Sequence, residues 1–138
     1  MVEMSEKKGI KQERELVNWL FNRGYMAVRV AGSGGGTKRP APDIICGDGV
    51  YQYVIELKSS NKDTIYLKDE QKRELEEFAQ GFGATPLFCA NFSYLNYVFV
   101  RPDKLSVTDG MNYKITRAQA KIWKINDLRP PVKEIWRA

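Results

Sequence analysis

The sequence contains no histidine and only two cysteines, Cys46 and Cys89, in 138 residues. Without histidine, the chain cannot build a Ser-His-Asp triad, a Cys-His dyad or a histidine-based metal site. Two cysteines alone cannot complete a tetrahedral zinc site. Both lie in apolar runs, which predicts buried free thiols and no disulfide. Any catalysis must therefore use carboxylates, lysines, hydroxyls and a hard metal ion bound through oxygen.

The sequence also lacks a long apolar run. No stretch approaches the ~18 apolar residues that a membrane span needs, and no hydrophobic segment follows the first lysines, Lys7 and Lys8. We therefore expect no membrane segment and no secretory signal, and a cytoplasmic protein. The length predicts a single domain over 1–138, with a core at about 7–105 and a C-terminal tail of unassigned role.

Positive charge is in excess, with 22 Lys+Arg against 17 Asp+Glu and a formal net charge of +5. This balance suits a polyanionic partner such as nucleic acid. Ordinary surface charge would give the same numbers, so the charge alone does not decide between the two.

Hydrophobic periodicity predicts an α/β fold in one domain, with a central mixed β-sheet flanked by helices. Helices are expected at 9–23, 67–82 and near 117–124, strands at 25–30, 43–46, 51–58, 86–91 and 96–101, and a small hairpin after residue 102. Residues 59–64 are expected to be a polar link.

Two groups of carboxylates lie where apolar or neutral residues are usual. Glu13 precedes Leu16 by three and Leu20 by seven, which places it on the apolar face of the first helix; the alternative is a first-turn carboxylate favoured by the helix dipole. In the hairpin, Glu56 and Lys58 share one face of their strand.

The hairpin brings Asp43 toward Glu56. If the loop is 47–50, Cys46 pairs with Tyr51 and Asp43 lies diagonally across from Glu56 on the same face, at about 7–8 Å. A three-residue loop would place Asp43 on the opposite face. Two converging carboxylates repel unless a cation neutralises them, which Mg²⁺ does together with water and phosphate oxygens. Pro42-Asp43 followed by Glu56-Leu57-Lys58 therefore predicts a metal-and-lysine site for phosphodiester hydrolysis.

The segment from Gly32 to Pro42 is rich in glycine and contains Ser33, Lys38 and Arg39. It does not fit a phosphate-binding P-loop, because Thr37 stands where glycine is needed and Pro40 and Pro42 prevent the following helix. We therefore expect no nucleotide cofactor. A basic loop whose Ser33, Lys38 and Arg39 contact DNA phosphates is the functional interpretation, and a plain surface loop is the alternative.

Aromatic residues are concentrated in 88–99. They are more typical of a core or a subunit interface than of a platform for stacking bases. Because these strands come late in the chain and carry surplus apolar residues, we expect a dimer interface within 88–99.

Five short motifs in this order resemble the archaeal Holliday junction resolvases of the Hjc family, in the PD-(D/E)xK nuclease superfamily. The motifs are Lys8-Gly9, Glu13-Arg14-Glu15-Leu16, Val28-Arg29-Val30-Ala31-Gly32-Ser33, Pro42-Asp43-Ile44-Ile45 and Ile55-Glu56-Leu57-Lys58. The similarity runs from about residue 7 to 105.

This resemblance implies a restriction-endonuclease-like nuclease core, dependence on Mg²⁺ (with Mn²⁺ as a substitute), a homodimer, and paired symmetric nicks in four-way junction DNA. By position it implies metal binding by Glu13, Asp43 and Glu56, and catalytic roles for these residues with Lys58 and Ser33. It implies DNA contacts for Arg14 and Ser33, and we also expect a DNA contact for Arg29, which stands in the matching motif. Two alternatives stay open: another nuclease of the superfamily that cuts duplex DNA, and a non-catalytic DNA-binding module.

Overall fold

The computed structural model describes residues 2–31, 39–123 and 127–131. They form a mixed α/β fold, as expected. The elements are α1 (Val2–Asn22), β1 (Met26–Arg29), β2 (Ile44–Gly47), β3 (Gln52–Ser60), β4 (Thr64–Leu67), α2 (Asp69–Phe82), β5 (Thr85–Phe92), β6 (Val98–Val100), the short 3₁₀ helix η1 (Pro102–Lys104), β7 (Ser106–Val107), β8 (Tyr113–Thr116) and α3 (Arg117–Trp123).

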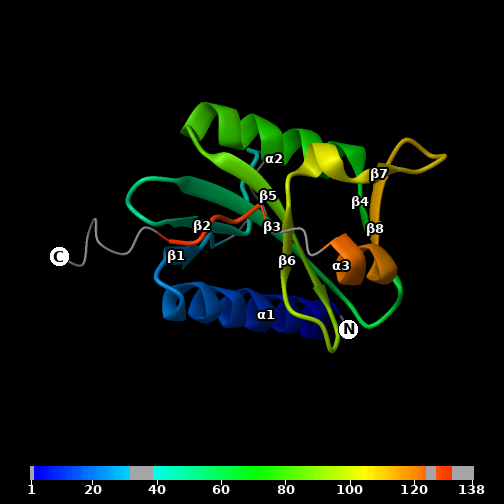
Figure 1. The fold of residues 1–138 in the computed structure, drawn as a ribbon, viewed down its shortest axis with the longest axis horizontal. Helices are drawn as coiled ribbons and strands as arrows, with labels where there is room; N and C mark the ends of the chain where they lie inside the picture. The colour runs from blue at the N-terminus through cyan, green and yellow to red at the C-terminus, as the bar shows by residue number, and fades with distance from the viewer. Residues whose placement is uncertain (1, 32–38, 124–126, 132–138) are drawn as a thin grey trace.

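The central sheet has five strands in the order β1-β2-β3-β5-β6. Strands β3 and β5 are parallel and the other pairs are antiparallel, so the sheet is mixed, as predicted. Figure 1 shows α1 along one side of this sheet and α2 along the other. A smaller antiparallel sheet, β4-β8-β7, lies beside the central sheet. No helix in the described part of the chain has the length and apolar character to cross a membrane.

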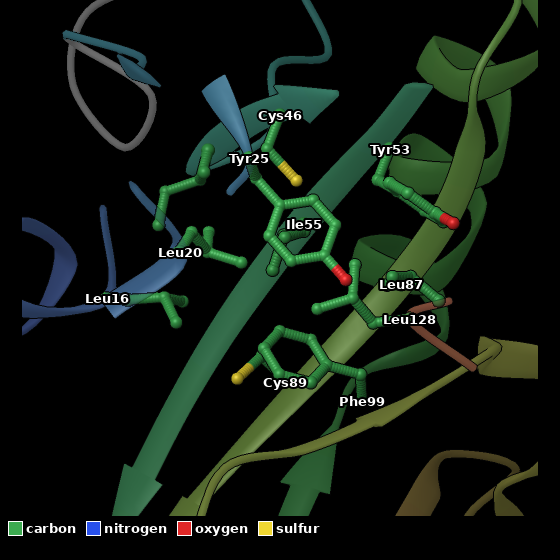
Figure 2. Close-up of a cluster of buried hydrophobic side chains, with 11 residues drawn as sticks. Leu16, Leu20, Tyr25, Cys46, Tyr53, Ile55, Leu87, Cys89, Phe99 and Leu128 are labelled. Atoms are coloured by element: carbon green, nitrogen blue, oxygen red, sulfur yellow. The ribbon is translucent and has the colours of Figure 1, made fainter. Parts of the chain in front are cut away.

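The main core fills the space between α1 and the central sheet (Figure 2). Leu16 and Leu20 of α1 are fully buried there, as the spacing of apolar residues predicts. Cys46 and Cys89 are buried free cysteines within the same cluster, which confirms the expected thiols.

The C-terminal segment 127–131 contributes to this core. Leu128 is 3% exposed and packs in the cluster of Figure 2. The N–H of Asp127 donates to the carbonyl of Phe99 at 2.9 Å, and the hydroxyl of Tyr25 donates to the carbonyl of Arg129. The part of the tail that the structure describes therefore closes one side of the core.

The aromatic segment 88–99 is largely internal. Phe88, Phe92 and Phe99 are at most 1% exposed, and Phe88 and Phe92 pack with the second, small sheet. Tyr94 is the fully exposed aromatic residue of this segment. The core interpretation is confirmed. Most apolar side chains of 88–99 pack inside the protein, which leaves little apolar surface for the expected dimer interface there.

One strand was missed by the sequence reasoning. The expected polar link at 59–64 is instead the end of β3 and the approach to β4, which pairs with β8 from Thr64↔Thr116 to Leu67↔Tyr113. The predicted late hairpin and short helix are confirmed as β7–β8 and α3.

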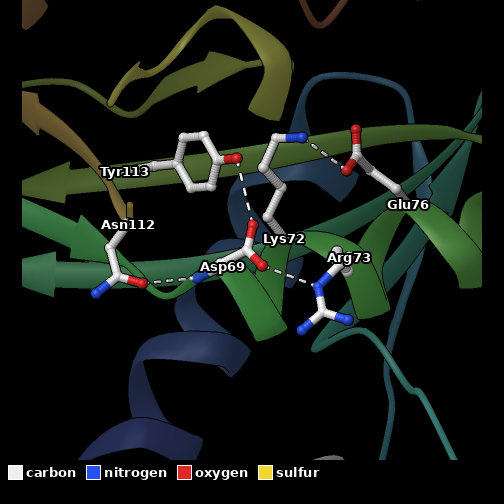
Figure 3. Close-up of polar contacts among 6 residues, drawn as sticks. All are labelled: Asp69, Lys72, Arg73, Glu76, Asn112 and Tyr113. Carbon is white, nitrogen blue, oxygen red and sulfur yellow. Dashed lines mark hydrogen bonds and ion pairs between the residues drawn. The ribbon is translucent and has the colours of Figure 1, made fainter. Parts of the chain in front are cut away.

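The start of α2 is fixed to the small sheet through Asp69 (Figure 3). Asn112 Oδ1 accepts the N–H of Asp69 at 3.0 Å, and the hydroxyl of Tyr113 donates to Asp69 Oδ1 at 3.3 Å. Arg73 also pairs with the Asp69 carboxylate at 2.9 Å. A carboxylate in the first turn is also favoured by the helix dipole. The contacts of Asp69 therefore fix the first turn of α2 against the small sheet.

Candidate active site

The β2–β3 hairpin is closed by a loop over 48–51. Asp48 is fully buried, and its Oδ1 accepts the N–H groups of Val50 at 2.9 Å and Tyr51 at 2.8 Å. Gly49 has a φ of 95°, which favours glycine. The loop has the expected length but starts one residue later than predicted.

This shift changes the register by two residues. Cys46 pairs with Tyr53, and Ile44 pairs with Ile55. Because side chains alternate along a strand, a two-residue shift keeps each side chain on its face. Asp43 and Glu56 therefore share a face, as predicted, but they lie next to each other and not diagonally.

Asp43 lies where β1 ends and β2 begins. Its N–H donates to the carbonyl of Ile55 at 3.0 Å, and its carbonyl accepts the N–H of Val30 at 2.8 Å. Its Oδ2 accepts the backbone N–H of Leu57 at 2.9 Å. The carboxylate thus occupies the edge of β3 beyond its last pairing with β2. Its residue is held by backbone groups of β3 and of Val30 after β1.

Glu56 lies beside this carboxylate and is mostly buried. Burial, a hydrogen bond between its carboxyl group and that of Asp43, and the charge of Asp43 raise the pKa of Glu56 to about 9. The nearby charge of Lys58 acts in the opposite direction. Without a cation, the pair therefore holds a proton at neutral pH, as two crowded carboxylates must. A divalent cation bound through oxygen can take the place of that proton.

Glu13 approaches the pair from α1. Burial and the charge of Asp43 raise the pKa of Glu13, while Arg29 lowers it. Its Oε1 lies 3.5 Å from Arg29 Nη1, and the Glu13 side chain is 16% exposed. The expected inward placement of Glu13 is confirmed, but its direct partner is Arg29. Among the described residues, no three acidic or cysteine side chains form a group able to hold a metal ion.

The other predicted site residues differ in their burial, and two of them lie outside the described residues. Lys58 is half-buried on the same face of β3 as Glu56. Arg14 is exposed on α1, and Arg39 is exposed where the described chain resumes before β2. Ser33 and Lys38 lie outside the described residues.

Sequence reasoning missed a polar pocket next to this site. It lies under α1 at the ends of β3 and β5 and includes Gln12, Ser59 and Asn91, with a volume of about 620 Å³. The signal was present as the polar run Ser59-Ser60-Asn61, directly after the Glu-Leu-Lys triplet.

Comparisons with known proteins identify relatives of this chain. A family model described as archaeal Holliday junction resolvase (Hjc) matches residues 4–135. The crossover junction endodeoxyribonuclease Hjc of Archaeoglobus fulgidus is 34% identical over 110 residues, covering 80% of this chain and 79% of the relative. The Hjc of Sulfolobus acidocaldarius is 36% identical over 112 residues, covering 80% and 78%.

A solved structure is also similar. The 1.6 Å structure of Archaeoglobus fulgidus Hjc, described as a Holliday junction resolvase from an archaeal hyperthermophile, aligns with a TM-score of 0.71 at 33% identity. The alignment covers 77% of this chain and 86% of that chain. The family match also extends past residue 105 and through the tail segment that packs in the core. This chain therefore belongs to the archaeal Holliday junction resolvase (Hjc) family.

Proposed function

We propose that this chain is a metal-dependent endonuclease that resolves four-way DNA junctions by paired, symmetric nicks. The observation that carries the proposal is the Asp43–Glu56 carboxyl pair at the edge of β3, with Lys58 two residues further along the same face. The names of the relatives, crossover junction endodeoxyribonucleases, support the choice of substrate.

The donor set fits Mg²⁺, with Mn²⁺ as a substitute. Asp43 and Glu56 offer only oxygen atoms, which hard cations prefer, and Mg²⁺ is commonly held by one or two carboxylates with water and phosphate completing its shell. A bound divalent cation supplies Lewis-acid activation of water for phosphodiester hydrolysis. Burial and the nearby Asp43 carboxylate, which raise the pKa of Glu56, favour a bound cation at this place.

Each residue has a separate part in this proposal. Asp43 and Glu56 hold the cation, and the backbone N–H of Leu57 fixes the Asp43 carboxylate. Lys58, about 6–7 Å from Glu56 along β3, donates to the attacking water or to a phosphate oxygen. Glu13 adds negative charge near the cation and becomes a ligand only by exchanging its contact with Arg29.

DNA contacts are proposed from the basic side chains around this site. Arg14 on α1 and Arg39 before β2 are exposed, and Ser33 and Lys38 belong to the same glycine-rich segment as Arg39. Released from Glu13, Arg29 would be free to meet a phosphate. These residues would bind the DNA backbone and would not distinguish between base sequences.

We further propose a homodimer, because a four-way junction has near two-fold symmetry and each chain has one carboxyl pair. An apolar surface suited to it lies on β1 and α2. Met26 and Val28 are 53% and 60% exposed, and Phe82 is 53% exposed. Val28 pairs with Ile45, which packs near Phe78, and Phe78 stacks on Phe82 with ring centroids 5.5 Å apart.

The proposed function is tested by cleavage of a labelled four-way junction and of a linear duplex of the same sequence, each with Mg²⁺ and with excess chelator. We expect Mg²⁺-dependent nicks at symmetric positions in the junction and little cleavage of the duplex. Equal cleavage of both DNAs would indicate a duplex nuclease. Binding without cleavage under any metal condition would indicate a DNA-binding module and contradict the proposal.

A further inference from the structure

The layer between α1 and the central sheet changes from apolar to polar at one end. The main core cluster reaches Leu57 on β3 and Cys89 on β5. Two residues further along, on the same face, stand Ser59 and Asn91, which are paired in register. Opposite them, Gly9 of α1 has open space around the position where a Cβ would lie. The pocket of about 620 Å³ opens between these surfaces.

The chemistry of this pocket suits an anion or a sugar–phosphate chain. Its lining combines hydroxyl and amide side chains with one lysine, Lys62, and among the described residues it contains no carboxylate. Serine, asparagine and glutamine side chains are common donors to DNA phosphates. Carboxylates in the lining would instead repel DNA phosphates.

The pocket wall is held in place by hydrogen bonds. Asn91 Nδ2 donates to Ser59 Oγ at 3.2 Å, and the N–H of Ser93 donates to the carbonyl of Ser60 at 3.0 Å. Arg117 donates to the carbonyl of Ser93 at 2.7 Å and to the carbonyl of Lys62 at 2.9 Å. The donors are thus positioned in advance. Arg117, which also pairs with Asp63 at 3.3 Å, holds the wall from behind.

The pocket adjoins the candidate active site from the other face of β3, because Ser59 shares the face of Leu57 and not that of Glu56 and Lys58. The backbone N–H of Leu57 binds the Asp43 carboxylate, and Ser59 follows about 6–7 Å further along the same strand. On the facing helix, Gln12 in the pocket lining directly precedes Glu13. A DNA strand that follows the edge of β3 past Asp43 and Glu13 would reach this pocket within a few nucleotides of the carboxyl pair.

We propose that this pocket binds the sugar–phosphate backbone of the cleaved strand, next to the scissile phosphate, through Gln12, Ser59 and Asn91. The inference rests on the proposed nuclease function and adds a positioning site to it. The site would hold the strand so that the scissile phosphate meets Asp43 and Glu56. Its neutral donors bind phosphate without attracting the metal ion away from the carboxyl pair.

The test introduces a negative charge into each wall by near-isosteric substitution, Asn91→Asp from β5 and Gln12→Glu from α1. The matched control is Asn22→Asp, an exposed position about 20 Å along α1 from Gly9, with the same change in net charge. Binding of a fluorescent four-way junction is measured in Ca²⁺ without Mg²⁺. We expect affinity to fall about tenfold or more for each pocket variant, the size of a lost charge-assisted hydrogen bond, and less than about twofold for the control.

A second measurement uses the unaltered protein. Single phosphates of the cleaved strand are replaced in turn by neutral methylphosphonates. We expect a loss of affinity at a position within about four nucleotides of the cleaved bond, given a rise of about 3.4 Å per nucleotide, and no such loss in Asn91→Ala. One result would overturn this inference and leave the proposed function intact. In that result the wild-type protein cleaves the junction, and Asn91→Asp and Gln12→Glu bind it as tightly as Asn22→Asp. Failure of the wild-type protein to cleave any junction would instead contradict the proposed function.

Discussion

At the residue scale, the proposed active site depends on two carboxyl groups that are adjacent only after folding. Asp43 and Glu56 are 13 positions apart, and their shared face follows from strand alternation once the hairpin loop is fixed. Their direct adjacency depends on Asp48 starting the hairpin loop, through its side-chain hydrogen bonds. Sequence patterns predict the residues, but both the shared face and the register depend on the loop that Asp48 caps. The Glu13–Arg29 pair depends in turn on how α1 packs on β1, which no local pattern encodes.

The raised pKa of Glu56 predicts a pH-dependent cost in stability. The folded state holds a proton on Glu56 up to about pH 9, whereas an ordinary glutamate releases it near 4.5. Between these values the folded state binds more protons, so the free energy of unfolding falls as pH rises. The Glu56→Gln variant has no titrating carboxyl group at this position, so it does not lose this stability as the pH rises. At pH 8 without divalent cations, we expect its free energy of unfolding to exceed that of the wild-type protein by about 1 kcal/mol or more, equivalent to a Tm about 3–6 °C higher.

Thermal unfolding at pH 5 and pH 8 checks this expectation, with Glu77→Gln, an exposed position on α2, as the control. The difference between Glu56→Gln and wild type should be small at pH 5. Saturating Mg²⁺ should stabilise the wild type more than the variant. A wild-type Tm that is independent of pH and Mg²⁺ would show that the carboxyl pair does not lower the stability of the folded state.

At the element scale, the elements with strong local periodicity were predictable and the one formed by distant pairing was not. Helix α1, the hairpin strands and β5 follow from apolar spacing. Strand β4 was missed because its four residues pair with β8, from Thr64↔Thr116 onward, far along the chain. The polar pocket was missed for a related reason, since it exists only where the ends of β3 and β5 meet α1.

The proposed dimer surface on β1 and α2 makes a direct prediction. Val28→Glu and Phe82→Glu each place a charge on an exposed apolar side chain of this surface. We expect either variant to shift the sedimenting species from about twice the chain mass of 15.8 kDa toward the monomer. Val107→Glu, 63% exposed on β7, is the control and should not alter the mass. Dimers that persist in both test variants would place the interface elsewhere.

The basic segment before β2 makes a second prediction at this scale. Replacing Lys38 and Arg39 with alanine should weaken junction binding and flatten its dependence on salt. Each lost phosphate contact lowers the slope of log affinity against log salt by about one. Binding isotherms across a salt series measure this slope. An unchanged slope would move the DNA-binding surface away from this segment.

At the scale of the whole molecule, the C-terminal segment belongs to the fold. Sequence reasoning assigned 126–138 no role, because a short run with two prolines has no periodicity to interpret. The place of its described part, 127–131, depends on tertiary contacts, with Leu128 in the main core and Arg129 hydrogen-bonded to tyrosines from two parts of the chain. The identity of the family, by contrast, was available from five short motifs.

The contribution of the tail is measurable by chemical unfolding. Leu128→Ala leaves a cavity in a site that is 3% exposed, so we expect a loss of about 2–5 kcal/mol in the free energy of unfolding. Val107→Ala at an exposed position should change it by less than about 0.5 kcal/mol. A small effect for Leu128→Ala would mean that the tail only rests on the surface.

The central claim is that Asp43, Glu56 and Lys58 carry out hydrolysis while other residues provide most of the affinity for DNA. The most direct measurement compares single-turnover cleavage and binding of one four-way junction for Asp43→Ala, Glu56→Ala and Lys58→Ala, with exposed Glu77→Ala as the control. The account predicts that each of the three variants loses cleavage while its affinity stays within about tenfold of wild type, and that the control retains both. A Glu56→Ala protein that cleaves the junction at the wild-type rate would contradict it.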